Sequence, residues 1–189
     1  MDLSAATLLT VFLATLLASQ GGRDQMLVAS LSHRLGPGPG LVLASVLAVC
    51  VSTAAWGWLG VQASAAIGED NRSTLVGIAI IVAAILLVLP TRLTLPKEPT
   101  RSIGAITIVL IMRQVFDAPR LLTFAGFAYL GSSFGLAVAA AALGSLCALA
   151  QAMVMGTKAA QWPYWQRLRI ALAIMVLAII LLVPRYWSL

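Results

Sequence analysis

The sequence has few charged residues, two cysteines and one histidine, and each shortage excludes a class of protein. Charged residues make up 10% of the 189 positions, whereas a soluble domain carries about 25%, so the chain cannot cover a soluble surface. Cys50 and Cys147 lie alone in separate apolar segments, which excludes a disulfide framework and a cysteine-based metal site. No base, nucleophile and orienting residue converge around His33. We therefore expect neither an enzyme nor a bound cofactor.

Apolar residues make up most of the chain. They account for 61% of the positions, and the mean hydropathy is +1.00. A helix that crosses a bilayer needs about 20 mainly apolar residues. The sequence predicts six such spans, at residues 3–34, 40–66, 72–90, 102–130, 134–156 and 166–184. These spans leave no room for a soluble domain, so we expect an all-α integral membrane protein whose main partner is the lipid bilayer.

An internal repeat relates the two halves of the chain. Residues 17–40 align without a gap on residues 112–135, and most positions in this window differ. The matches that are hardest to attribute to composition are two glycine pairs and, further on, an arginine pair: Gly36 with Gly131, Gly40 with Gly135, and Arg72 with Arg167. Each repeat would hold three spans, and an odd number inverts the second copy relative to the first. The sequence therefore predicts two inverted three-helix repeats, an arrangement common in secondary transporters.

Basic residues indicate how the chain is oriented. They gather in the first, third and fifth loops and their flanks, as Arg34, Arg92, Lys97, Arg101, Lys158, Arg167 and Arg169. Because cytoplasmic loops carry an excess of Lys and Arg, we expect both termini outside the cytoplasm, in a bacterial inner membrane. The domains would be a first repeat at 1–90, a cytoplasmic linker at 91–101 and a second repeat at 102–189. The net charge of +6 then belongs to loops, and nothing resembling a nucleic-acid-binding module is present.

Polar residues interrupt the first span of each repeat. In the second repeat the apolar run 102–112 rises roughly 16 Å as a helix, about half the hydrocarbon thickness, so the residues after it should lie near mid-depth, with Pro119 interrupting the helix. By the repeat, the residues around Gly21 and Gly22 should lie there too, although residues 3–18 could also nearly span and leave Arg23 at the surface. The candidate site residues are Ser19, Gln20, Arg23, Asp24, Gln25, Arg113, Gln114, Asp117 and Arg120.

Five of these candidates are charged, which is costly inside a membrane. Each charged side chain costs about 2.5–3.5 kcal/mol at the centre of a spanning helix. The five must therefore pair with one another or face a water-filled cavity. The sequence allows two interpretations: a binding site, or an ion-pair cluster that locks the two halves together.

Two short stretches resemble the repeated motif of a transporter family. The stretches "SQGGRDQ" (19–25) and "QVFDAPR" (114–120) follow the layout of an E-x-G-D-[KR]-[ST] motif with a trailing glutamine. An apolar run and a glycine follow each of them. With these altered motifs the chain resembles the Gdt-type manganese/calcium transporter family, also called uncharacterised family 0016. Each motif position is filled by one residue of the first copy and one of the second. The glutamate position holds Ser19 and Gln114, and the aspartate position holds Gly22 and Asp117. The basic position holds Arg23 and Ala118, and the hydroxyl position holds Asp24 and Pro119.

The resemblance implies export of manganese or calcium in exchange for protons. Asp24 and Asp117 would then be paired acids that hold metal or protons alternately. Gln114 would be a neutral metal ligand, and Gln20 and Gln25 would contribute further oxygens.

Two other functions remain open. Three arginines against two aspartates would leave the centre near one positive charge, which suits export of an anionic or zwitterionic solute. A non-transporting partner within a membrane complex is the third hypothesis. Small residues in 134–150 would allow close helix packing within one chain or in a homo-oligomer.

Overall fold

Every helix that the sequence predicts inside the described residues is present. The computed structural model describes residues 5–89, 102–130, 134–156, 168 and 170–174. Their main elements are all α-helices: α1 (Ala5–Ser19), α2 (Arg23–Leu35), α3 (Pro39–Ile67), α4 (Glu69–Val88), α5 (Ile103–Gln114), α6 (Ala118–Leu130) and α7 (Phe134–Met155). The expected all-α class is therefore confirmed for this part of the chain.

Three of these helices are long and apolar enough to cross a membrane. Their apolar segments are Pro39–Ile67 in α3, Asn71–Val88 in α4 and Gly135–Met155 in α7. Large apolar side chains point outward from them, such as Leu136, which is 66% exposed, and Val154, which is 86% exposed. Such helices indicate a membrane protein. The sixth expected span, 166–184, lies mostly outside the described residues.

The first expected span of each half is a pair of short helices. α1 has 15 residues and α5 has 12, so they rise about 22 and about 18 Å, less than the roughly 30 Å of a hydrocarbon core. Residues 20–22 separate α1 from α2, and residues 115–117 separate α5 from α6. In the first break Gly21 has a φ of 68°, a left-handed conformation that glycine adopts without steric cost.

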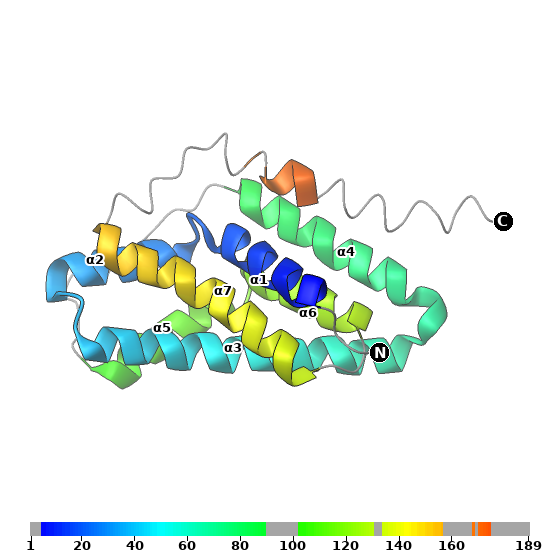
Figure 1. The fold of residues 1–189 in the computed structure, drawn as a ribbon, viewed down its shortest axis with the longest axis horizontal. Coiled ribbons are helices and arrows are strands. Elements are labelled where there is room, and N and C mark those ends of the chain that lie inside the picture. The colour runs from blue at the N-terminus through cyan, green and yellow to red at the C-terminus, as the bar shows by residue number, and fades with distance from the viewer. Residues whose placement is uncertain (1–4, 90–101, 131–133, 157–167, 169, 175–189) are drawn as a thin grey trace.

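The helix boundaries follow the 95-residue offset of the sequence repeat. Four boundaries of the first half and their counterparts coincide under it: Ser19 with Gln114, Arg23 with Ala118, Leu35 with Leu130, and Pro39 with Phe134. Figure 1 shows that α1 and α2 run in one direction along the long axis, and that α5 and α6 run in the opposite direction. The two interrupted helices are thus antiparallel.

Each interrupted helix packs against a long helix of the other half. α1 and α2 contact α7, and α5 and α6 contact α3. Glycines permit the closest approaches: a methyl group on Gly60 of α3 would lie 2.5 Å from the carbonyl oxygen of Phe124 in α6, and one on Gly144 of α7 would overlap Thr15 in α1. With this packing the two breaks meet: a methyl group on Gly22 would lie 3.5 Å from Asp117 Oδ2.

Candidate functional site

Polar side chains fill the centre of an otherwise apolar bundle. Arg120 is the largest fully buried side chain of the described residues, and Asp24, Gln25 and Gln114 are each at most 2% exposed. All four flank the two breaks: Gln114 ends α5, and the other three lie in the first turns of α2 and α6. Because buried polar groups are costly unless they have partners, their hydrogen bonds show how the centre is built.

Arg120 ties four helices together. From α6 it donates through Nε to Ser52 Oγ in α3 at 2.8 Å and through Nη1 to Ser145 Oγ in α7 at 3.0 Å. Its Nη2 donates to Gln114 Oε1 in α5 at 3.0 Å. The planar guanidinium suits three acceptors in fixed directions, so the charge is held in one place.

Gln114 links this arginine to Asp24. Its Oε1 accepts from Arg120 and also from Ser52 Oγ at 2.6 Å. Its Nε2 donates to Asp24 Oδ2 at 3.2 Å. Since Oε1 already accepts two hydrogen bonds, Gln114 offers little as the metal ligand that the resemblance implies.

Three glutamines fasten the first break to α7. Gln25 donates to the carbonyl of Ala148 at 3.0 Å and to Gln20 Oε1 at 3.1 Å, and its own Oε1 accepts from the Gly21 amide at 2.6 Å. Gln20 in turn donates to Gln151 Oε1 at 2.7 Å. Gln20 and Gln25, both candidate ligands by sequence, therefore hold the backbone of the break in position.

Ser19 closes the polar centre at the end of α1. Its hydroxyl contacts Ser145 Oγ at 3.4 Å and donates to the carbonyl of Thr15 at 2.7 Å. Ser145 is therefore shared between Ser19 and Arg120.

The carboxylates of Asp24 and Asp117 meet beside Gly22. A methyl group on Gly22 would lie 2.8 Å from Asp24 Oδ1 and 3.5 Å from Asp117 Oδ2. Asp24 Oδ1 accepts the Gln25 amide at 2.8 Å, and Asp117 Oδ1 accepts the Ala118 amide at 2.9 Å. Asp117 Oδ2 is buried and accepts no hydrogen bond from any described residue.

The three candidate arginines do not share one environment. Arg120 is 1% exposed, but Arg23 is exposed and Arg113 is half-buried. Arg23 therefore lies on the outside of the bundle and not among the buried side chains of its centre. Adjacent residues of a helix point about 100° apart, so Arg23 and Arg113 can point away from the centre while Asp24 and Gln114 point into it.

This sorting changes the charge of the centre. Asp24, Asp117 and Arg120 together leave one negative charge when both acids are ionised, whereas the sequence suggested one positive charge. The exposed Arg23 also acts electrostatically on Asp117. A cation is then the favoured ligand.

Sequence reasoning missed the partners on the long helices. Ser52, Ser145 and Gln151 lie in α3 and α7, where a small or single polar residue in an apolar helix gives no distinct pattern. The available signal was the buried arginine itself, because five N–H donors require acceptors from neighbouring helices.

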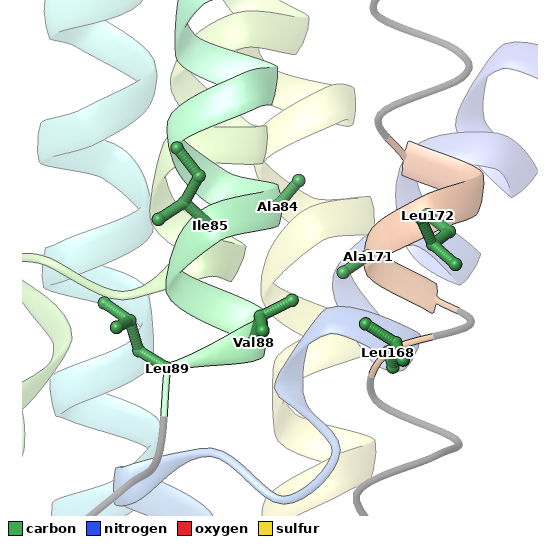
Figure 2. Close-up of a pocket in the computed structure, with 7 residues that line it drawn as sticks. All are labelled: Ala84, Ile85, Val88, Leu89, Leu168, Ala171 and Leu172. Carbon is green, nitrogen blue, oxygen red and sulfur yellow. The ribbon is translucent and has the colours of Figure 1, made fainter.

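Other candidate sites are less suitable for a polar ligand. Among the described residues no three His, Cys, Asp or Glu side chains gather as a metal-binding group. A pocket of about 230 Å³ lies beside α4. Figure 2 shows the aliphatic side chains that line it: Ala84, Ile85, Val88, Leu89, Leu168, Ala171 and Leu172. It offers no ligand to an ion.

Comparison of the chain with protein-family models, with curated proteins and with solved structures gave no match. The chemistry of the centre therefore has to support the functional assignment.

Proposed function

We propose that this chain is a secondary transporter that exchanges a cation for protons at Asp24 and Asp117. Its six spans would form two inverted three-helix repeats, 1–90 and 102–189, in a bacterial inner membrane. The 95-residue offset of the helix boundaries and the antiparallel course of the interrupted helices support this architecture.

One observation carries the proposal: carboxylates at the two breaks face the same space, and one carboxylate oxygen there has no hydrogen-bond partner among the described residues. A buried ionised carboxylate without a partner is costly. Asp117 therefore needs a proton or a cation at Oδ2. A carboxylate that binds a proton and a cation alternately couples the movement of protons to the movement of the cation.

The packing of the halves supplies a route for alternating access. The centre lies where α1 and α2 pack on α7 and where α5 and α6 pack on α3. A shift of one half against the other would open the centre first to one side of the membrane and then to the other. Arg120 crosses this interface through Ser52 of α3, and Ser145 of α7 crosses it through Ser19 of α1. These two hydrogen bonds would break and re-form as the halves move.

Manganese and calcium are the cations that the resemblance implies, and both belong in a first assay. Export of an anion receives less support, because the buried guanidinium of Arg120 already donates to three neutral side chains.

The test is a flux assay in vesicles that contain the purified chain and a trapped pH indicator. Salts of manganese, calcium, sodium and potassium are added outside, one at a time. We expect at least one to drive proton movement. Asp24→Asn and Asp117→Asn should each abolish it, whereas Glu69→Gln, which removes an exposed carboxylate at the start of α4, should retain it. Full activity in both asparagine variants would refute the proposal, and wild-type vesicles without flux would favour a non-transporting partner.

A further inference from the structure

The space in front of Gly22 is surrounded by oxygen atoms. A methyl group placed on Gly22 would have three nearest neighbours outside the adjoining residues: Asp24 Oδ1 at 2.8 Å, the Ser19 carbonyl at 3.1 Å and Asp117 Oδ2 at 3.5 Å. These oxygens come from the start of α2, the end of α1 and the second break. Three oxygens around one point form the kind of environment in which proteins hold hard cations.

The backbone does not require glycine at position 22. Gly22 has φ −66° and ψ 164°, an extended conformation open to any residue, unlike Gly21 with its positive φ. What a side chain would lack is room, since its Cβ would meet Asp24 Oδ1 at 2.8 Å. A side chain at position 22 would occupy the space between the two carboxylates.

Each of the three oxygens has capacity for another interaction. Asp117 Oδ2 is buried and has no hydrogen-bond partner within the part of the chain that the structure describes. Asp24 Oδ1 accepts one hydrogen bond, from the Gln25 amide, and the Ser19 carbonyl accepts the Gly22 amide at 3.2 Å. An oxygen of either kind has a second lone pair.

The charge around this space suits one positive charge and not two. Asp24 and Asp117 supply two negative charges, and the buried Arg120 interacts electrostatically with both. Arg23 also interacts with Asp117, but its side chain is exposed and lies outside the buried centre. Arg120 is fixed by its three hydrogen bonds. A monovalent ion would neutralise the centre. A divalent ion would leave an uncompensated positive charge in a buried site, which is costly.

We infer that the transported cation occupies the space in front of Gly22, and that Arg120 acts as a built-in counter-ion that limits this site to a single positive charge. The substrate is then a monovalent metal ion exchanged for one proton. This inference rests on the proposed cation–proton exchange and narrows its substrate.

The experiment compares ions and two glycine variants in the vesicle assay described above. Sodium or potassium should drive proton movement, and manganese and calcium at the same concentration should be less effective by roughly tenfold or more. Gly22→Ala should reduce the monovalent response to background. The matched control is Gly38→Ala: Gly38 precedes α3 with φ −80° and ψ 162°, and a methyl group there would meet nothing within 4 Å.

A binding measurement on the wild-type chain covers the case in which Gly22→Ala does not fold. Because a ligand that binds only the native state stabilises it, sodium or potassium chloride should raise the melting temperature in detergent above that in choline chloride of equal ionic strength. Manganese and calcium salts should not raise it further.

The possible results separate this inference from the proposed function. Proton movement driven by manganese or calcium but not by sodium or potassium would overturn the inference and leave the proposed exchange standing. Equal activity of Gly22→Ala and Gly38→Ala would also overturn it. No proton movement with any ion would overturn both.

Discussion

The side-chain amide of Gln114 donates a 3.2 Å hydrogen bond to Oδ2 of Asp24, and so joins the break between α5 and α6 to the break between α1 and α2. The same glutamine accepts from Arg120 and from Ser52. Gln114 thus connects the two halves of the chain, because it is hydrogen-bonded both to the buried guanidinium of Arg120 and to the carboxylate of Asp24.

Gln114→Glu should shift the preference of the centre toward divalent cations. The substitution keeps the size of the side chain and adds a second net negative charge. The new carboxylate would face Asp24 Oδ2 where the amide now donates, so a cation would be needed between them. We expect the apparent affinity for manganese or calcium to rise by about tenfold or more, measured from the concentration dependence of proton flux.

The control for this prediction is Gln62→Glu, which adds the same charge at an exposed position of α3. It should leave the response to both ions unchanged. An unchanged divalent response in Gln114→Glu would count against the charge argument.

Arg120→Gln should lower the free energy of unfolding by about 3–5 kcal/mol, the usual effect of removing one partner of a buried charge group. The loss leaves two carboxylates without their counter-ion, and Ser52 and Ser145 without their donor. Arg120→Lys should be intermediate, because an ammonium keeps the charge but not the planar set of donors. Melting of the purified chain in detergent, followed by tryptophan fluorescence, measures the difference.

Arg34→Gln is the control for Arg120. Arg34 is exposed near the end of α2, and its removal should change the stability by no more than about 1 kcal/mol. If Arg120→Gln melted at the same temperature as Arg34→Gln, the hydrogen bonds of Arg120 would not stabilise the fold as proposed.

Gly144→Ala should separate α1 from α7. The added methyl group would overlap the Phe12 carbonyl and Thr15 Oγ1 and lie 3.0 Å from the amide of Leu16, and backbone atoms cannot rotate away. Overpacking of this kind costs about 1–3 kcal/mol. Gly126→Ala is the matched control, since a methyl group there meets nothing within 4 Å and alanine favours a helix by up to about 1 kcal/mol. Comparable melting temperatures for the two variants would show that these helices do not touch as described.

The two helix breaks could be predicted from the sequence because an apolar run was too short to cross a bilayer as one helix. The apolar run before Arg113 is too short to cross a bilayer, and the 95-residue repeat carried the same expectation to the first half. Pro119, which we expected to interrupt the helix, is instead the second residue of α6, where its missing N–H leaves no hydrogen bond unmade. The interruption lies just before it, at residues 115–117.

The internal order of the centre could not be predicted from the sequence. Arg23, Arg113 and Arg120 all lie close to a break, and a one-residue difference in position turns a side chain about 100° around a helix. Which arginine enters the bundle depends on the serines opposite, and Ser52 and Ser145 look like other small residues of an apolar helix. The repeat places Gly22 and Asp117 at equivalent positions, and the resemblance pairs Asp24 with Asp117. How closely Gly22 approaches Asp117 depends on the packing of the two halves, which the sequence does not give.

The meeting of Asp24 and Asp117 can be tested directly by thiol cross-linking. The chain would carry Asp24→Cys and Asp117→Cys, serines in place of the exposed Cys50 and Cys147, and a protease site within 91–101. After treatment with a short thiol-bridging reagent and cleavage, we predict that the two fragments remain joined. They should separate when the second cysteine instead replaces Met112, which is 72% exposed on α5. The fragments of the chain with cysteines at 24 and 117 could instead separate as completely as those of the control with cysteines at 24 and 112. That result would contradict a shared site between the two interrupted helices.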